Sequence, residues 1–554
     1  MPASSSLSRS SLRIPQERGS LRTLKEGKSE FIGSSSGVYF VNTVRRAFSA
    51  ANSRSVSVPQ DATHPSPEDC LLPGDGDDDN GSVCRSSRAG ATAAASQGAS
   101  KLSYGPSIPL ELGRPPPANL AKQLFMSYFQ TWHQFLPFLH GPALLQDIEL
   151  LYADIDKRPL PNPRPHPLPL AKVITLQCLF NLANLHCDDL PMASRIDHPV
   201  DILSLLPDLA IKSDIISTQA LLAAQLLLVA RLALRPAAVV GGLLSRSIFL
   251  AGLHRCPNRY LELSTEECNI RKRVFWSVYV IDRYISQALG QPLGIQDSDI
   301  DVCSLSGPEL HDSHCHTSTH SSLHTSHLDS TWHASRGENS PSDTPSVRQN
   351  QGTSPSLEDG RCKTMKTGRP QSSSNSECQS QEHHRHSILA SYVDHSRLLG
   401  NALELFHKSL HVRSIKPEFI ISLRTDVSAW WNALPIHLQN DSSSSEAPAT
   451  SKSGAPGSHN CKFGVAAFFS LLHNQLVLLI NRPWLSLEPS SSEFQSALQT
   501  CIGASREIIT ILDKQLDSGN PLFWPGYLSA AWMAGIILAF ACHLSLYPVQ
   551  KGQK

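Results

Sequence analysis

The chain of 554 residues has no net charge, because 48 Lys and Arg residues balance 48 Asp and Glu residues, and charged side chains make up only 17% of it. A neutral chain lacks the overall positive charge of a general DNA or membrane binder. Charge is uneven locally, since residues 1–58 hold nine basic and three acidic side chains. This excess predicts at most a nonspecific attraction to phosphate.

Cysteine pairs with a recognisable spacing are absent. The thirteen cysteines include no C-x-x-C motif, which argues against a disulfide scaffold and against a zinc knuckle. The first residues are polar and do not form a signal peptide. We therefore expect a reducing, intracellular environment.

Motifs of catalysis are also scarce. Neither phosphate-binding pattern, G-x-x-x-x-G-K-[ST] or G-x-G-x-x-G, occurs in a suitable setting. The stretch GSSSG, Gly33–Gly37, fits the G-x-S-x-G turn of serine hydrolases, with Ser35 as the nucleophile. That turn needs a strand before it and a parallel sheet around it. Polar residues precede the match and no sheet is predicted after it, so we do not expect Ser35 to be a nucleophile.

Two stretches match metal sites only in part. The acidic stretch 297–301 has the spacing of the start of an EF-hand loop, but Val302 and Pro308 occupy the positions that require Gly and Glu. The stretch 311–333 contains seven histidines and one cysteine in a Ser- and Thr-rich background that supplies no fixed geometry. We predict an acidic loop and a spacer, and no metal or other cofactor in this chain.

Helical periodicity dominates the rest of the chain, and no segment is rich in strand formers. The clearest helix begins at Ser264, which forms a capping box with Glu267. An apolar stripe follows at intervals of three or four residues: Ile270, Val274, Val278, Ile281, Ile285 and Leu289. The pattern predicts an all-α fold with many helices, interrupted by long disordered inserts.

Composition divides the chain into six parts. They are a disordered basic arm at 1–29, a short ordered segment at 30–50, a disordered low-complexity linker at 51–116, a helical block at 117–305, a disordered Ser- and His-rich insert at 306–386, and a second helical block at 387–547 with a disordered break at 440–459. The polar segments bury too little apolar surface to offset the entropy of ordering.

The apolar segment 527–547 is about as long as a membrane-spanning helix, which needs about 20 residues. It contains His543 and several serines, and it follows other apolar helices of globular type. We therefore predict a buried core helix and keep a tail anchor as the alternative.

Residues 271–302, RKRVFWSVYVIDRYISQALGQPLGIQDSDIDV, resemble the middle homology region of the fungal-specific transcription factor regulatory domain. The residues that carry the resemblance are Arg273, Phe275, Trp276, Tyr279, Asp282, Arg283, Ser286, Gly290, Pro292, Asp297, Asp299 and Asp301. The chain departs from the family at Gln291, where Arg is frequent, and at Cys303-Ser304, which replace Leu-Pro. Segments 31–48, 243–255 and 471–485 are similar to further stretches of these proteins.

This resemblance implies a nuclear regulator of RNA polymerase II transcription, related to Zn2Cys6 activators of the xylanolytic-activator type, and not an enzyme. The helical blocks at 117–305 and 387–547 then form one regulatory domain of this chain. In it, the residues that carry the resemblance, called the signature residues, have a structural role. We expect Arg273 and Asp282 to fix how neighbouring helices and the 290–302 loop dock. The implied partners are DNA, the transcription machinery or co-regulators, a second copy in a homodimer and a small-molecule inducer, but no membrane.

The six-cysteine zinc cluster with which such regulators bind DNA has no counterpart in the sequence, where Cys70 and Cys84 stand alone. We interpret the chain as truncated, with a regulator that lacks the cluster as the alternative. Zinc is implied only if a missing N-terminal cluster exists, so DNA binding by this chain is expected to be weak or indirect. A helical small-molecule-binding protein or enzyme, and a tail-anchored membrane protein, are the alternative functions.

Overall fold

The computed structural model describes residues 20–23, 29–52, 108–153, 168–306 apart from Asp188 and Leu261, 374–408, 416–439, and 464–546 apart from Pro521 and Phe523. Most of the segments predicted to be disordered, including the histidine-rich tract 311–333, lie outside these residues. One helix begins at Ser374, inside the predicted insert 306–386, so part of that insert is helical.

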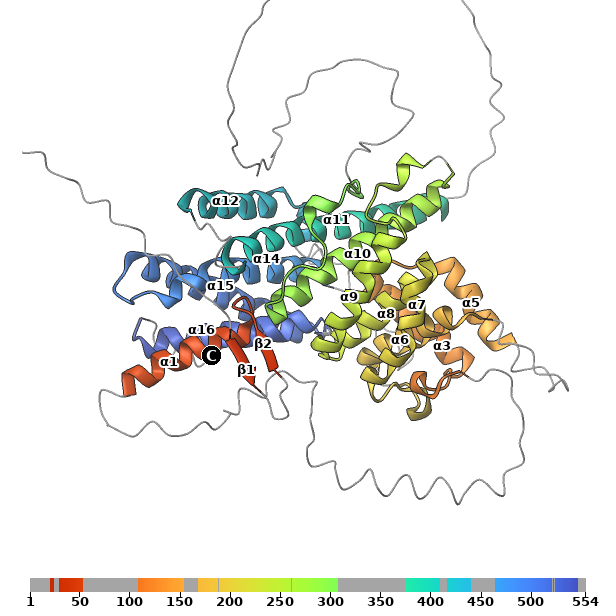
Figure 1. The fold of residues 1–554 in the computed structure, drawn as a ribbon, viewed down its shortest axis with the longest axis horizontal. Helices are drawn as coiled ribbons and strands as arrows, with labels where there is room; N and C mark the ends of the chain where they lie inside the picture. Colours follow the sequence, from red (N-terminus) through yellow and green to blue (C-terminus); the bar gives the residue numbers. More distant parts are fainter. Residues whose placement is uncertain are drawn as a thin grey trace, which may run out of the picture. The chain divides into compact units, whose positions relative to one another are not determined.

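The described residues are mostly helical (Figure 1), which confirms the all-α fold class. The α-helices are α1 Gly37–Asn52, α3 Ala118–Gln130, α4 Trp132–Phe135, α5 Gly141–Ala153, α6 Leu170–Cys187, α7 Pro207–Lys212, α8 Ile215–Ala230, α9 Leu234–Leu250, α10 Thr265–Leu289, α11 Ser374–His407, α12 Pro417–Ala433, α13 Ile436–Gln439, α14 Val465–Asn481, α15 Ser492–Asp517 and α16 Pro525–His543. Short 3-10 helices are η4 Leu110–Leu112, η5 Met192–Ser194, η6 Pro199–Leu205, η7 Pro257–Arg259, η8 Asp297–Asp299 and η10 Arg482–Ser486.

A small hairpin precedes the first helix. Strand β1, Ser20–Thr23, pairs antiparallel with β2, Ser29–Ile32, so that Leu21 lies opposite Phe31. The sequence did not predict this hairpin, because strand β1 lies in the segment 1–29 that its polar composition assigned to disorder. Two short strands have too few residues to show the alternating pattern that identifies a strand.

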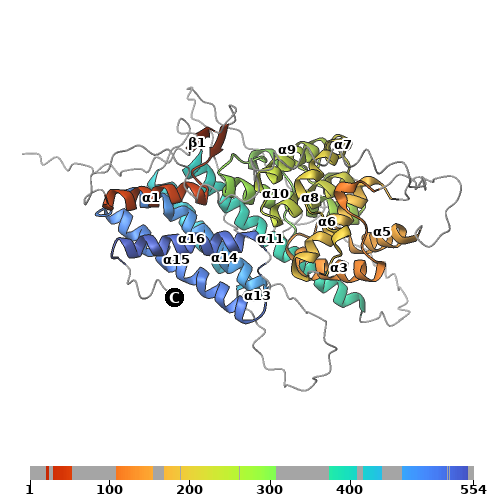
Figure 2. The same ribbon diagram turned by 90° about the horizontal axis from the view of Figure 1, so that it is seen from below.

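One compact unit contains the described residues that precede Asp312 and those that follow Gln381. In its first part α6, α8, α9 and α10 pack in succession, and in its last part α14, α15 and α16 do so. Figure 2 shows α1 lying beside α16. The second unit, Asp312–Gln381, includes the first residues of α11 and is otherwise outside the described residues.

Helix α10 lies in the core and carries the predicted stripe. Val274, Val278, Ile281, Ile285 and Leu289 are all buried, and Ile270 is half-buried at the start of the helix. Helix α8 is buried on almost every side, as its continuous run of Leu and Ala requires. The central stripe of α10 is therefore part of the core, as its spacing predicts.

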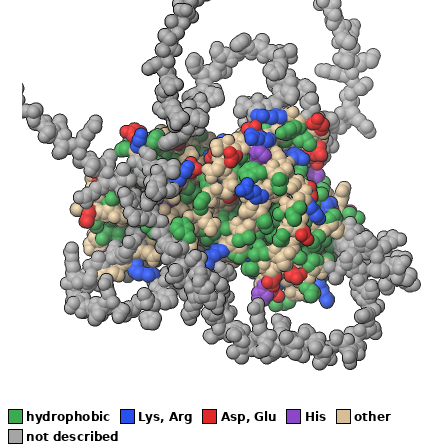
Figure 3. Space-filling model, viewed as in Figure 1, with side chains coloured by type: hydrophobic (Ala, Val, Ile, Leu, Met, Phe, Trp, Pro, Cys, Tyr) green, Lys and Arg blue, Asp and Glu red, His purple; other side chains and the backbone are tan. Residues whose placement is uncertain are grey.

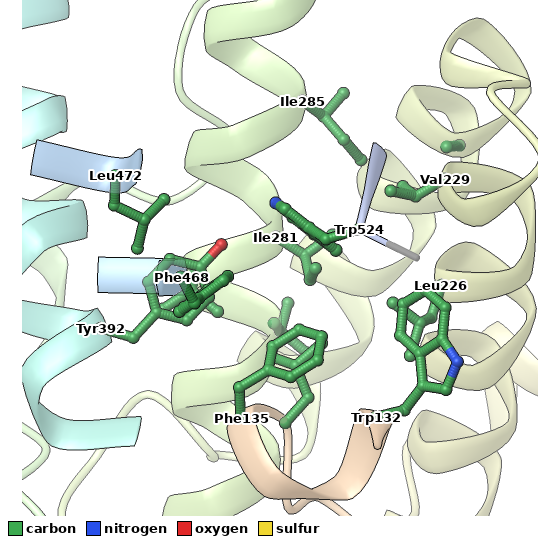
Figure 4. Close-up of a cluster of buried hydrophobic side chains, with 14 of the residues drawn as sticks. Trp132, Phe135, Leu226, Val229, Ile281, Ile285, Tyr392, Phe468, Leu472 and Trp524 are labelled. Atoms are coloured by element: carbon green, nitrogen blue, oxygen red, sulfur yellow. The ribbon is translucent and has the colours of Figure 1, made fainter. Parts of the chain in front are cut away.

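An aromatic cluster joins the first helical block to the second (Figure 4). The ring of Trp524, just before α16, lies 5.5 Å from Phe135 of α4, 4.7 Å from Tyr284 of α10 and 6.5 Å from Phe468 of α14, measured between ring centroids. Tyr392 of α11 contacts Phe468 edge to face at 5.2 Å. Side chains from segments up to about four hundred residues apart thus share one core.

Two described helical stretches, Val465–Ser486 and Pro525–His543, are long and apolar enough to cross a membrane. Most of each is buried against other helices, with 67% and 56% of the respective apolar windows inside the fold. Helix α16 packs on α15 and on α1. This packing is typical of core helices in a globular protein and agrees with the prediction for 527–547.

Candidate functional site

The signature helix α10 has defined ends. The Ser264 hydroxyl accepts a hydrogen bond from the Glu267 amide at 3.3 Å, and the Glu267 carboxylate accepts one from the Ser264 amide at 2.9 Å. The predicted capping box is therefore confirmed. Gly290 ends the helix in the left-handed conformation, at φ 68°, which favours glycine. Beyond it, the Ser286 hydroxyl donates to the Pro292 carbonyl at 3.3 Å, so the chain turns back over the helix end.

A fully buried arginine organises the last turns of α10. The Arg283 guanidinium donates to Asp282 Oδ2 and to Asp297 Oδ1, each at 3.0 Å, and it lies 3.5 Å from the centre of the Tyr279 ring. The Tyr279 hydroxyl also donates to Asp297 Oδ1, at 2.6 Å. Two carboxylates therefore compensate one buried cation, which is the condition for burying a charge without a large loss of stability.

Asp282 also holds the loop after the helix. Its carboxylate accepts hydrogen bonds from the backbone amides of Gly294, at 3.1 Å, and Ile295, at 3.4 Å. A Cβ atom at Gly294 would lie 2.6 Å from Asp282 Oδ1. Burial raises the pKa of Asp282, and the Arg283 charge and the two amides oppose that shift. These hydrogen bonds join Asp282 to the 290–302 loop, and its role in fixing how that loop docks stays a prediction.

The other signature residues divide between the core and the surface. Phe275 and Trp276 are buried, and the Trp276 indole donates to the Cys303 carbonyl at 3.1 Å. Arg273 is buried in another part of α10, near His133 of α4, whose pKa is lowered by burial and further by the Arg273 charge. Asp299 is exposed.

The acidic stretch 297–301 binds cationic side chains. Asp297 contacts Arg283, while Asp301 Oδ2 lies 2.9 Å from Arg259 Nη2 and 3.5 Å from Arg255 Nη1. Among the described residues, no group of three or more His, Cys, Asp or Glu side chains could hold a metal ion. The residues that the structure describes therefore do not fit a zinc cluster.

The GSSSG stretch is packed against the end of α10. The Gly33 amide donates to the Leu289 carbonyl at 3.3 Å, and the Gly33 backbone lies so close to Gly290 that a Cβ atom would meet the Gly290 carbonyl oxygen at 1.7 Å. The Ser35 hydroxyl is buried and donates to the Gln287 carbonyl at 3.3 Å. The sheet found in the described residues is a two-stranded antiparallel hairpin, not the parallel sheet of a hydrolase.

Arg482, the first residue of η10, holds the same stretch from the other side. Its Nη2 donates to the Ser35 carbonyl at 2.6 Å and to the Ser34 carbonyl at 3.4 Å, and its guanidinium carbon lies 5.5 Å from the Phe40 ring centre. The Ser34 hydroxyl is hydrogen bonded to His407 Nδ1 at 2.7 Å. Sequence reasoning missed Arg482 and His407, because neither has a spacing that relates it to the distant serines.

We call the contact of residues 33–36 with Leu289, Gly290, His407 and Arg482 the GSSSG junction. It brings together three segments that are similar to stretches of one family, namely 31–48, 271–302 and 471–485. These segments are distant in sequence and adjacent in space. The junction is the candidate functional site.

Comparison with known proteins identifies the family of this chain. A family described as the fungal specific transcription factor domain matches residues 125–432, more than half of the chain. The chain belongs to this family. It is therefore a regulator of transcription, as the resemblance of 271–302 predicted.

Relatives with transcriptional names support this assignment. The probable transcription factor FUP6 of Fusarium proliferatum (strain ET1) is 54% identical over 546 residues, which are 97% of this chain and 73% of the relative. The transcriptional activator protein acu-15 of Neurospora crassa is 24% identical over 34% of this chain and 19% of its own length. Activator of stress genes 1 of Saccharomyces cerevisiae is 27% identical over 34% of this chain and 20% of its own length. No solved structure matches the chain.

Proposed function

We propose that this fungal transcription factor domain acts in the nucleus on transcription by RNA polymerase II, through contacts with other proteins and not through catalysis. The GSSSG junction is the observation that supports this mode of action most. It fixes the 31–48 segment to α10, α11 and η10 with hydrogen bonds from buried groups. By resemblance, such a segment lies between the linker of a DNA-binding module and the regulatory domain. The junction then transmits the state of the regulatory domain towards the DNA.

DNA contact by this chain is proposed to be weak or to depend on a partner. The chain has no net charge, and the face drawn in Figure 3 mixes basic, acidic and hydrophobic side chains over the described residues. Tight DNA binding requires a concentration of Lys and Arg that neutralises several phosphates. We propose co-regulators or the transcription machinery as the protein partners of this chain.

A reporter assay tests the regulatory function. The full chain is fused to a heterologous sequence-specific DNA-binding domain and expressed in fungal cells with a reporter that carries its operator. We expect a change in reporter transcription that depends on the operator and that Arg482→Met reduces. Arg506→Met is the matched control, since Arg506 is exposed on α15. A folded, nuclear fusion that leaves the reporter unchanged contradicts the proposal.

A gel-shift titration tests the DNA part separately. The full chain alone should give weak shifts that do not depend on sequence and disappear as salt rises, because any contact is with phosphates. Tight, sequence-specific shifts that survive raised salt would refute weak or indirect DNA binding. They would leave the reporter prediction intact.

A further inference from the structure

Two buried cysteines face each other beside the signature loop. The Sγ atoms of Cys256 and Cys303 lie 3.6 Å apart, and neither cysteine is in a disulfide. Cys256 is fully buried and Cys303 is 4% exposed. No sequence pattern predicts this pair, because 47 positions separate the two residues. The fold alone brings them together.

The backbone on both sides of the pair is fixed. The Cys256 amide donates to Asp301 Oδ1 at 2.8 Å, and the Asp301 amide donates to the His254 carbonyl at 3.2 Å. The Cys303 carbonyl accepts from the Trp276 indole at 3.1 Å. A disulfide needs an S–S distance of about 2.05 Å, so the sulfurs must approach further while the anchored backbone keeps the pair together.

We propose that Cys256 and Cys303 form a reversible disulfide when the protein meets a hydroperoxide. The thiolate of one cysteine attacks a peroxide oxygen and becomes a sulfenic acid, and the O–O bond breaks to release hydroxide, or an alkoxide from an organic peroxide. The second thiol then attacks the sulfenic sulfur, forms the S–S bond and releases water. Two thiols are oxidised and one peroxide is reduced. A cellular dithiol reverses the reaction by exchange.

A disulfide here would join the connection between α9 and α10 to the end of the signature loop. Asp301, which links the two segments through Arg255 and Arg259 at present, depends on contacts that water and salt can weaken. The covalent bond would hold the segments in place of these contacts. Since disulfides in a reducing compartment are usually transient or redox-sensing, the pair fits a regulatory modification.

Cys268 of α10 is a third thiol in this region, close enough to Cys256 for their charges to interact. No hydrogen bond anchors its sulfur to Cys256 or Cys303 among those found in the described residues. We therefore assign the disulfide to Cys256 and Cys303, with Cys268 as an internal control.

Peptide mapping of the native full chain tests the assignment. Reduced protein is titrated with hydrogen peroxide, remaining thiols are blocked by unfolding the protein in denaturant that contains N-ethylmaleimide, and the chain is cut with trypsin and a glutamyl endopeptidase. Cleavage after Glu309 separates Cys303 from Cys315. We expect one main cross-linked pair, which joins Cys256 to Cys303 and is lost on treatment with dithiothreitol.

Variants make the test decisive. Cys256→Ala and Cys303→Ala should abolish the cross-link, whereas Cys268→Ala and Cys178→Ala should keep it. Peroxide should also raise the melting temperature of the wild type and leave that of Cys303→Ala unchanged, because only the wild type gains the bond. The proposal is overturned if the native chain, after equilibration with oxidised glutathione, contains no cross-link between Cys256 and Cys303. It is also overturned if Cys256 is linked equally to several cysteines. Neither result bears on the reporter assay, so the two proposals fail independently.

Discussion

Gly33 and Gly290 approach each other through their backbones at the centre of the GSSSG junction. The Gly33 amide donates to the Leu289 carbonyl at 3.3 Å, and a Cβ atom on Gly33 would overlap the Gly290 carbonyl group. Both positions require glycine, because neither has room for a side chain. The GSSSG pattern is therefore explained by close packing between two distant segments, and not by a strained nucleophile turn.

Gly33→Ala should weaken this docking. The added methyl group must push the 29–52 segment away from α10, and overpacking of this kind typically costs about 1–3 kcal/mol. We expect faster trypsin cleavage after Arg45 of α1 and a lower free energy of unfolding in urea. Gly503→Ala in α15 is the control, since a Cβ there meets nothing within 4 Å. It should stabilise the chain slightly through helix propensity. Equal cleavage rates in wild type and Gly33→Ala would show that the segment is not held by this contact.

Arg482→Met should release the same segment from the other side. The substitution keeps the apolar stem and removes the hydrogen bonds to the carbonyls of Ser34 and Ser35, which are buried. Leaving buried acceptors without a partner costs about 1–3 kcal/mol for each group. Urea unfolding should show a loss of about 2 kcal/mol or more for the two carbonyls, with the exposed Arg506→Met unchanged. A double variant with Gly33→Ala should lose less than the sum, because both act on one contact.

The sequence predicted the helical class, the capping box and the buried stripe of α10, because these depend on residues close together along the chain. It also suggested that Asp282 fixes the 290–302 loop, which stays a prediction. It could not give the partners of Arg283, which is buried between Asp282 and Asp297. The junction with Arg482 and the pairing of Cys256 with Cys303 depend on tertiary structure alone. Periodicity contains no information about contacts between such distant segments.

Asp282→Asn removes the negative charge of Asp282 and keeps a side chain of nearly the same shape. Asparagine can still accept a hydrogen bond from the Gly294 amide, but it no longer neutralises Arg283, whose side chain is fully buried. Loss of one partner of a buried ion pair costs about 3 kcal/mol or more, and Asp297 offsets part of this cost. Thermal and urea unfolding should both show the loss. Asp299→Asn, at an exposed position of the same loop, should have no measurable effect. Equal stability of the two variants would mean that the Arg283 charge is compensated without Asp282.

Acid should destabilise the fold through His395 of α11. Its imidazole is 4% exposed, and burial lowers its pKa from the ordinary 6.5 to about 3. Below pH 6.5 the unfolded chain binds a proton on His395 that the folded chain does not accept until the pH nears 3. Stability is therefore full above pH 6.5 and falls with decreasing pH by about 1.4 kcal/mol per pH unit for this group.

Urea unfolding measured between pH 7.5 and pH 5 tests the contribution of His395. His395→Gln cannot take up the proton. The slope of its free energy of unfolding against pH should therefore be smaller than the wild-type slope by the contribution of about one proton, whatever its stability at pH 7.5. His198→Gln, at an exposed position, should keep the slope of the wild type. Part of the slope should persist in His395→Gln, because burial and the Arg273 charge also lower the pKa of His133. A His395→Gln protein with the full wild-type slope would show that His395 is protonated in the folded state, and that its buried position admits the charge.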